Sequence, residues 1–535
     1  MCGGPGAACA GIGAGDGRKE EWPSTDAGSS AARPPRSSRP SPRAGPRRPA
    51  PPAARTARPS PAGSTAAWSS RATRTTRRPD SSSSRATTAS PRPRSRTRRT
   101  PATSPPAWTS PAAPACPSSP AAAATATPGG RPAPAGSSST SAPSTGPPSR
   151  EAPPRGAAVR IGAGARIGDV NRTLAARGLG IPTGLCPTVG IAGLTLGGGL
   201  GPSSRAYGAT CDRLTGATAV TPDGRVREVG EGADPDLFWA LRGGGGGNFA
   251  VVTEFRFAAH PAPDCALAEL RWADGDSAAL LHGWQRWLAD LPEPFWSRIE
   301  FLLDGGPPAP PAVRVLCLDG PAELDRRLDR LAALVGRPPQ DVRTTVRGYG
   351  DTLREMSGCG QDTAEQCRLP GRLPGRSPAG RGARESYGAR SDFWPAAGLP
   401  AAGIATVLAA VRSYADRVPP GGAGVVQFTG ECGGALNRPA AGATAFAHRD
   451  SAFLAQYLAY WPATAAAAET ARHLAWLDRL WQDLRPWASG RAYQNYPDPG
   501  LRDWRTAYYG PNLARLEAVR RARDPDRLFR FPQAV

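Results

Sequence analysis

The sequence predicts an α+β fold, and three observations support that class. The composition changes abruptly near residue 157, and only the part after it has the apolar content of a folded domain. From there to about residue 262, short strand and helix patterns surround a glycine-rich loop. From about residue 263, strands alternate with longer amphipathic helices. We therefore expect a folded region in two parts, preceded by a segment of different character.

Residues 1–158 lack the side chains that build a core. They contain no Leu, Val, Phe, Tyr, His, Asn or Gln, and Ile12 is their one Ile. Such a chain cannot bury enough apolar surface to offset its conformational entropy, so we predict that residues 1–156 are disordered. Three origins stay open: a natural arm that binds polyanions, a linker, or translation of GC-rich coding DNA in the wrong frame.

The formal charge of +22 does not by itself indicate nucleic-acid binding. Residues 1–155 hold 22 Arg and Lys19 against six acidic residues, whereas the other 380 residues hold 43 basic and 38 acidic residues. The folded part is nearly balanced, so no specific nucleic-acid partner is expected. No run reaches the ~18–20 apolar residues of a membrane span, so no membrane association is expected. The first residues show no signal-peptide pattern, and the localisation stays unknown.

The ten cysteines are scattered and lack the paired spacing of a metal site, so we expect no metal. Cys359 and Cys367 are close enough in sequence for a local disulfide in an exported protein, with two reduced thiols as the alternative. We expect His260, His282 and His473 to be packing or solvated residues, since none has a metal-ligand partner in the sequence.

The segment Leu185–Gly201 carries the strongest chemical signal. Cys186 stands just before six glycines that fall within twelve residues, Gly190 to Gly201. Glycine has no side chain, so this backbone can lie directly against a flat ligand or a pyrophosphate. A phosphate-bearing cofactor beside a thiol is the first hypothesis, and a buried turn with a core cysteine is the alternative.

The first folded part begins with a predicted strand at 159–161 and a helix at 167–174. Residues 217–220 and 225–229 predict two strands around the turn Thr221-Pro222-Asp223-Gly224.

A short helix follows, with Asp234 as its cap and Pro235 in its first turn. Arg242, five glycines and Asn248 come next. An alternating pattern then predicts a half-buried strand with five residues on one face: Phe249, Val251, Thr253, Phe255 and Phe257.

In the second part, leucines at helical spacing predict helices over 324–334 and 474–484. Residues 370–384 are rich in Gly, Pro and Arg and predict a loop. Gln427 and Phe428 lie on a predicted strand before Gly433. The last forty residues are dense in aromatic side chains.

The order and spacing of several blocks resemble the berberine-bridge-enzyme-like FAD-linked oxidases of the vanillyl-alcohol-oxidase fold superfamily. The resemblance covers 157–262 and 488–535 closely and 263–485 loosely. Its blocks are Cys186-Pro-Thr-Val-Gly, Gly197–Gly199, Tyr207-Gly208, Leu237–Gly244, Gly247-Asn248-Phe249, Tyr493-Gln-Asn-Tyr496-Pro-Asp498, Tyr508-Tyr509-Gly510, Asn512, Arg515-Leu516 and Asp524-Pro525 with Phe529.

The resemblance implies a domain order. Residues 157–262 would form the C-terminal half of a PCMH-type FAD-binding domain. Residues 263–487 would form an α+β substrate domain, an antiparallel sheet covered by helices. Residues 488–535 would return to the FAD domain.

The resemblance also implies the cofactor, FAD, with a possible 6-S-cysteinyl link at Cys186. Such a link raises the flavin potential and favours hydride abstraction from an alcohol carbon. Val189 falls where a small residue is linked to oxygen access, which favours an oxidase. The implied cofactor-binding residues are Cys186, Val189, Gly190, Gly193, Gly197, Gly198, Gly199, Tyr207, Asn248, Val252, Tyr493 and Asn495.

Tyr496 matches the family's active-site tyrosine and would take the substrate hydroxyl proton as hydride leaves for flavin N5. Without the resemblance, an aromatic packing residue is the favoured interpretation. On an extended segment, Asn495 and Tyr496 would point to opposite faces, which makes Asn495 a flavin or backbone ligand. Gln427 is the candidate substrate-binding residue, with an ordinary strand residue as the alternative. His448-Arg449 resembles a family element of uncertain role.

The chain departs from the family before residue 157. The expected Arg…Gly-Gly-His-Ser-Tyr segment, which wraps the pyrophosphate and often supplies a flavin-linked histidine, is absent, since no histidine precedes His260. Frameshift-like sequence stands in its place.

The predicted function is FAD-dependent oxidation of an alcohol group of a sugar or secondary metabolite, with O2 as electron acceptor. Its partners would be the small-molecule alcohol and O2, and the oligomeric state stays unknown. The alternative is a non-catalytic, degenerate oxidase domain whose basic arm binds polyanions. A nicotinamide-dependent reductase is set aside, because the glycine loop lacks the strand–GxGxxG–helix unit with a later acidic residue.

Overall fold

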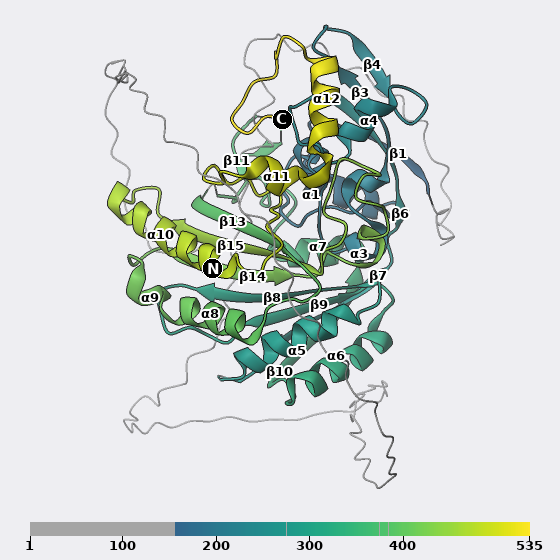
Figure 1. The fold of residues 1–535 in the computed structure, drawn as a ribbon. Helices are drawn as coiled ribbons and strands as arrows, with labels where there is room; N and C mark the ends of the chain where they lie inside the picture. The colour runs from purple at the N-terminus through teal and green to yellow at the C-terminus, as the bar shows by residue number, and fades with distance from the viewer. Residues whose placement is uncertain (1–155, 274, 374, 384) are drawn as a thin grey trace, which may run out of the picture. The chain divides into compact units, whose positions relative to one another are not determined.

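A computed structural model describes residues 156–273, 275–373, 375–383 and 385–535 of the chain. The predictions for residues 1–155 lie outside these residues. Within them, two antiparallel sheets organise the molecule, a four-stranded sheet and a seven-stranded sheet (Figure 1). The α+β class is therefore confirmed.

The four-stranded sheet has the order β1-β5-β3-β4. Its strands are β1 (Ala158–Gly162), β5 (Val251–Ala258), β3 (Leu214–Val220) and β4 (Val226–Val229). The predicted strand at 159–161 and the predicted β3–turn–β4 unit are confirmed. A two-stranded ladder lies beside this part, formed by β2 (Leu179–Gly180) and β6 (His260–Pro261).

Short helices complete this first part. They are α1 (Ile167–Ala175), α2 (Ile191–Leu196), α3 (Ser204–Tyr207), η2 (Thr210–Arg213) and α4 (Pro235–Leu241). Asp234 caps α4 as predicted, its carboxylate accepting a hydrogen bond of 3.3 Å from the Leu237 N–H. The C-terminal elements α11 (Trp504–Tyr509), η4 (Gly510–Asn512) and α12 (Leu513–Arg523) return here, and α12 contacts α4.

The prediction of which β5 residues are buried is wrong for the first half of the strand. Phe255 and Phe257 are fully buried as expected, but Val251 and Thr253 are exposed and Val252 is buried. The register against β3 slips between the pairs made by Glu254 and Val252, so Thr253 is an extra residue in the ladder. A bulge of this kind reverses which residues point inward.

The seven-stranded sheet has the order β10-β7-β9-β8-β14-β15-β13, and every pairing is antiparallel. Its strands are β10 (Asp341–Gly348), β7 (Asp264–Arg271), β9 (Ala312–Cys317), β8 (Phe295–Leu303), β14 (Ala423–Thr429), β15 (Phe453–Trp461) and β13 (Ser386–Trp394). The strand predicted around Gln427 is the central strand β14.

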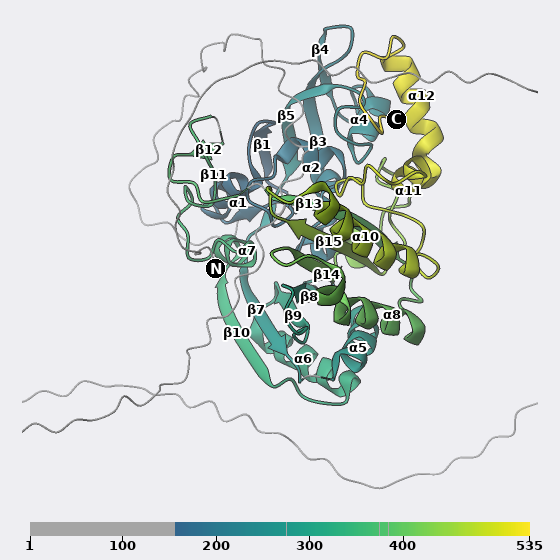
Figure 2. The same ribbon diagram turned by 90° about the vertical axis from the view of Figure 1, so that its left-hand side faces the viewer.

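Helices cover one face of this sheet (Figure 2). They are α5 (Ser277–Ala289), α6 (Pro321–Val335), α8 (Ala401–Arg412), α9 (Tyr414–Arg417) and α10 (Ala467–Leu484). The two leucine-spaced helices predicted from the sequence are α6 and α10. A large core of Trp, Phe, Leu and Val side chains fills the space between helices and sheet, which leaves the opposite face for a site.

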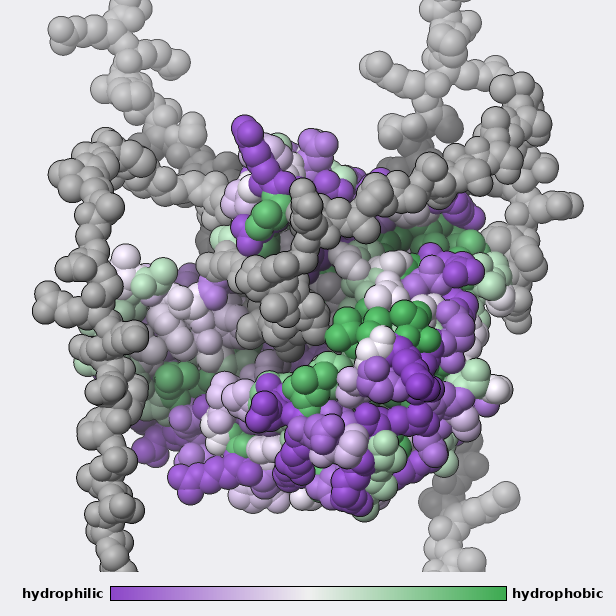
Figure 3. Space-filling view, turned by 90° about the horizontal axis from the view of Figure 1, so that it is seen from above, coloured by the Kyte–Doolittle hydropathy of each residue, from purple (hydrophilic) through white to green (hydrophobic). Residues whose placement is uncertain are grey.

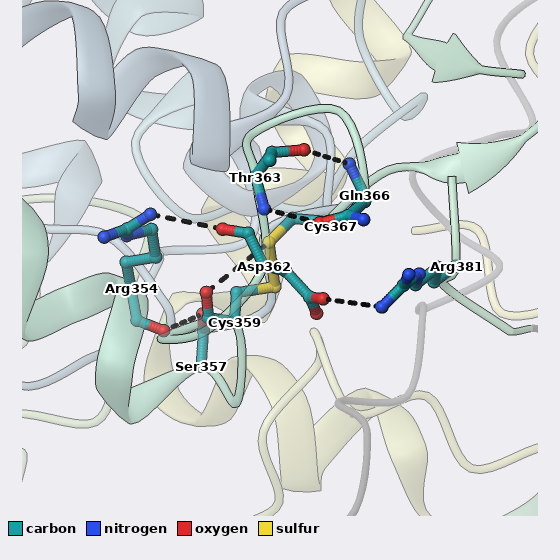
Figure 4. Close-up of a disulfide and its surroundings, with 8 residues drawn as sticks. All are labelled: Arg354, Ser357, Cys359, Asp362, Thr363, Gln366, Cys367 and Arg381. Atoms are coloured by element: carbon teal, nitrogen blue, oxygen red, sulfur yellow. Dashed lines mark hydrogen bonds and ion pairs between the residues drawn. A yellow bond between two sulfur atoms is a disulfide. The ribbon is translucent and has the colours of Figure 1, made fainter. Parts of the chain in front are cut away.

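The connection after α7 (Tyr349–Met356) carries a disulfide between Cys359 and Cys367 (Figure 4). Hydrogen bonds between Thr363 and Gln366 turn the chain between the two cysteines. The local disulfide is therefore confirmed over two reduced thiols. The 370–384 segment predicted as a loop pairs once with the chain before it, through β11 (Leu369–Pro370) and β12 (Arg376–Ser377). One more short helix, η3 (Gly434–Leu436), lies between β14 and β15 in the chain.

The surface of the described part is mixed in character. In the view of Figure 3, hydrophilic side chains cover much of it and hydrophobic ones gather in small patches. Within the described residues, no helix has both the length and the apolar character that crossing a bilayer requires.

Candidate functional site

A cavity of about 150 Å³ lies between the glycine-rich loop and the uncovered face of the seven-stranded sheet. It brings together seven of the residues predicted for the site: Cys186, Val189, Gly193, Gln427, Tyr493, Asn495 and Tyr496. These residues come from the glycine loop, from β14 and from the segment after α10, which are far apart in the sequence. Their meeting in one cavity supports the candidate site.

The segment that contains Tyr493 packs against the glycine loop and forms hydrogen bonds with it. The Tyr493 hydroxyl accepts hydrogen bonds from the N–H groups of Gly199 (3.0 Å) and Leu200 (3.1 Å). The Asn495 amide donates to the same hydroxyl at 2.9 Å and to the Leu194 carbonyl at 3.0 Å. Burial raises the pKa of the Tyr493 hydroxyl well above its usual range, so it stays protonated. Tyr493 and Asn495 therefore hold the loop as well as lining the cavity.

The expectation that Asn495 and Tyr496 point to opposite faces is wrong. The chain turns here, with the Tyr496 N–H donating to the Tyr493 carbonyl at 2.8 Å. Because the segment is not extended, both side chains line the cavity. The Tyr496 ring packs edge-on against the Tyr493 ring, with centroids 4.9 Å apart.

The glycine loop is not irregular throughout, since α2 occupies its middle and Gly190 is the residue before that helix. Close packing around the loop leaves no room for a side chain at several of its glycines. A Cβ at Gly197 would lie 2.0 Å from the Asn495 Oδ1, and one at Gly199 would lie 2.1 Å from the Thr210 Oγ1. Gly199 also has φ of +82°, a conformation that L side chains rarely adopt.

The sheet forms the opposite wall of the cavity with a row of polar side chains. Glu300 on β8, Gln427 on β14 and Gln456 on β15 are direct cross-strand neighbours. The Gln427 amide donates to the Gln456 Oε1 at 2.6 Å, and Arg298 pairs with Glu300 at 3.3 Å. This row offers amide and carboxylate groups to a ligand that carries hydroxyls.

Sequence reasoning missed most of this wall: Arg298, Glu300, Glu431 and Gln456. A signal was present for three of them. Arg298 and Glu300 in Phe295–Leu303, and Gln456 in Phe453–Trp461, are polar residues on the strand face that the helices leave uncovered.

Seven predicted cofactor ligands do not line this cavity: Gly190, Gly197, Gly198 and Gly199 of the glycine loop, and Tyr207, Asn248 and Val252. Tyr207 stacks on His260 with ring centroids 3.8 Å apart. Asn248 is buried, and its side chain donates to the Gly244 carbonyl at 2.9 Å and accepts from the Val535 N–H at 3.0 Å. Val252 belongs to the core under β5. Their predicted roles stay predictions.

His448 and Arg449 lie behind the glycine loop. Arg449 forms a two-pronged ion pair with Asp212, at 2.6 and 2.7 Å. It also holds Phe446, whose ring blocks the space where Gly198 would carry a Cβ, at 2.6 Å. Burial lowers the pKa of His448 to about 3, so this histidine is neutral. His260 and His473 are buried as well and His282 is exposed, as predicted for packing or solvated histidines.

The cavity fits the reactive end of a flavin. Glycine backbone and the Cys186 thiol line it. Two buried oxygens at the loop, Thr195 Oγ1 and Gln494 Oε1, have no hydrogen-bond partner among the described residues. At about 150 Å³, the cavity is smaller than the ~300–1,000 Å³ of typical small-molecule sites, so it accommodates only part of a dinucleotide.

Comparisons with known proteins agree with this site. Residues 149–230 match the family described as FAD binding domain, and residues 492–535 match the family described as Berberine and berberine like. The uncharacterized FAD-linked oxidoreductase YgaK of Bacillus subtilis is 31% identical over 381 residues, which cover 69% of this chain and 75% of YgaK. The chitooligosaccharide oxidase of Gibberella zeae is 29% identical over 66% of this chain and 68% of its own length.

Among solved structures, xylooligosaccharide oxidase from Myceliophthora thermophila C1 in complex with xylobiose matches with a TM-score of 0.60 and 26% identity. The match covers 72% of this chain and 79% of that one. With its two matched segments at the glycine loop and at the closing segment, and with its cofactor FAD, the chain belongs to the berberine bridge enzyme-like family of FAD-linked oxidoreductases.

Proposed function

We propose that this protein oxidises an alcohol group of a sugar, with O2 as the final electron acceptor. The observation that carries the proposal is the meeting of Cys186, Tyr496 and the polar row with Gln427 around one cavity. The names of the relatives, which act on chitooligosaccharides and xylooligosaccharides, support a sugar. The amide and carboxylate groups of the sheet wall favour a substrate rich in hydroxyls over an apolar metabolite.

In this proposal, Tyr496 takes the proton of the substrate hydroxyl as a carbonyl forms. Bound FAD would supply the acceptor for the hydride, and its reoxidation by O2 would give hydrogen peroxide. Gln427 and Gln456 orient the hydroxyls of the substrate. Val189 leaves space for O2, Gly193 lets the ring approach the backbone, and Cys186 tethers the cofactor.

The test is anaerobic reduction of the flavin by xylobiose and diacetylchitobiose, in wild type and Tyr496→Phe. The change removes one hydroxyl, and reduction should slow by about a hundredfold, the usual size of a lost general base. Stopped-flow absorbance measures the rate. Tyr414→Phe is the matched control, since its buried hydroxyl has no partner among the described residues and lies in the core under the sheet.

Reduction of Tyr496→Phe within a few-fold of wild type would move the base elsewhere. Flavin that no sugar reduces would favour the non-catalytic alternative, in which a degenerate oxidase domain binds polyanions through a basic arm and that binding falls steeply with salt.

A further inference from the structure

Two polar side chains that line the cavity each carry an atom without an ordinary hydrogen bond among the described residues, and neither has a place in the proposed reaction. Glu431 follows β14 and is 6% exposed, and its Oε2 has no hydrogen-bond partner among the described residues. Trp296, on β8, is 1% exposed, and its Nε1 has no hydrogen bond of ordinary geometry there, although it lies close enough to the Glu431 carboxyl to lower the pKa of that group. Both side chains line the cavity.

Such groups are costly in a folded protein. A buried donor or acceptor without a partner loses its hydration and gains nothing in return, so most are paired. Here one acceptor-bearing group and one donor lie in the same cavity. A ligand that both donates and accepts would satisfy both at once, and a hydroxyl is the simplest group of that kind.

The surroundings of Glu431 favour a neutral ligand group over a cation. Burial raises the pKa of its carboxyl, and Thr429, Trp296 and the charge of Arg298 oppose only part of that rise. The carboxyl is therefore held toward its protonated form, which itself donates and accepts. Glu300 already pairs with Arg298 at 3.3 Å, so no excess negative charge faces the ligand.

We infer that Glu431 and Trp296 form a subsite for a second hydroxyl of the substrate, distinct from the hydroxyl that is oxidised. This inference rests on the proposed oxidation of sugars and deepens it. The substrate hydroxyl donates to the Glu431 Oε2 and accepts from the Trp296 Nε1. The pair thereby selects which sugar, and which end of it, reaches Tyr496.

The experiment uses the full-length holoprotein and the aldonolactones of xylobiose and diacetylchitobiose, the products of the proposed oxidation. Calorimetry measures their affinity in wild type, Glu431→Gln, Glu431→Leu and Trp296→Phe. Gln keeps a donor and an acceptor, so its affinity should stay within a few-fold of wild type. Leu and Phe should weaken binding about tenfold, as expected for one lost hydrogen bond.

The matched control for Trp296→Phe is Trp394→Phe. The Trp394 Nε1 is also buried without an ordinary hydrogen bond in the part of the chain that the structure describes, but the side chain belongs to the core on the helix-covered side of the sheet. This variant should bind the lactones as wild type does.

Lactones that lack one hydroxyl each identify the recognised group. One deletion should weaken wild type about tenfold and leave Glu431→Leu unchanged, because the two changes remove the same interaction. The inference would be overturned if, for every hydroxyl, the affinity lost on its removal simply added to the affinity lost in Glu431→Leu. Equal lactone affinity in wild type and Glu431→Leu, or no binding by wild type, would also overturn it.

These outcomes are separate from those of the proposed function. Lactone binding that depends on Glu431 in a protein whose flavin no sugar reduces would keep the subsite and reject the oxidation. Flavin reduction by sugar with unchanged lactone affinity in the variants would do the opposite.

Discussion

Cys186 stands at the cavity end of the glycine loop, where a covalent bond to the flavin would tether it. We predict that the full-length protein keeps its yellow colour through acid precipitation, and that Cys186→Ala releases most of that colour into the supernatant. Absorbance of both fractions checks this. Cys265→Ala is the control, because that cysteine is buried on β7 and does not line the cavity. Equal retention in wild type and Cys186→Ala would assign the tether to another residue.

We predict that His448 makes the free energy of unfolding depend on pH in the acid range. Burial lowers its pKa to about 3 from an ordinary 6.5, so the unfolded chain binds the proton more readily than the folded one. The contribution of neutral His448 to the free energy of unfolding is fully present above pH 6.5. It should be lost as the pH falls toward 3, by about 1.4 kcal/mol per pH unit. His448→Leu should remove this slope from the free energy of unfolding.

Urea denaturation at several pH values between 6.5 and 4 measures the difference between the two proteins. Replacement of the exposed His282 by Leu is the control and should leave the slope of wild type intact. Parallel curves for wild type and His448→Leu would mean that the histidine is protonated in the folded state.

Among single residues, sequence patterns predicted the cavity residues that come from loops and Gln427 on the sheet wall, and missed Arg298, Glu300, Glu431 and Gln456. Cys186 and Tyr496 belong to recognisable blocks. Glu431 belongs to none, and the subsite inferred for it depends on burial and on an Oε2 without an ordinary hydrogen bond among the described residues, which no spacing reveals. Asn495 was placed on the wrong face because a turn, not a strand, carries it.

Among the elements, η2 and the segment around Arg449 are joined by one buried ion pair. The Arg449 and Asp212 side chains are 3% and 12% exposed, and Arg449 also donates to the Leu436 carbonyl and the Thr444 hydroxyl. Arg449→Lys keeps the charge but loses the planar fork that makes these bonds. We predict a loss of about 2 kcal/mol in the free energy of unfolding.

Arg491→Lys is the matched control for that change. Arg491 also pairs with an aspartate, Asp450, but their side chains are 29% and 69% exposed. Such pairs contribute about 0–1 kcal/mol, so urea denaturation should show little change. An equal effect in both variants would remove the special role of the buried pair.

Elements with strong periodicity followed from the sequence, as α6 and α10 show. The face of β5 did not, because a single extra residue at Thr253 reverses the alternation and leaves no mark in composition. The helix α2 inside the glycine loop was missed for a related reason: Gly is unfavourable in helices, and packing of Ile191, Leu194 and Leu196 overrides that preference.

For the whole molecule, we predict that FAD stabilises the full-length chain. A ligand that binds only the folded state adds about 2.7 kcal/mol at a hundred times its Kd, so the melting temperature should rise with FAD concentration. Differential scanning fluorimetry on protein prepared without FAD measures the melting temperature. Addition of NAD should produce no rise. Absence of any shift with FAD would indicate a domain that has lost its cofactor.

The hydrogen bonds between Tyr493 and the glycine loop also imply an order of events during synthesis of the chain. The Gly199 N–H and the Tyr493 hydroxyl are 294 residues apart in the chain. At roughly 5–20 residues per second, the ribosome makes Tyr493 about 15–60 seconds after Gly199. For that interval the nascent glycine loop lacks the side chains that close it, since Asn495 arrives later still. Cofactor binding in the finished geometry therefore follows the synthesis of the seven-stranded sheet.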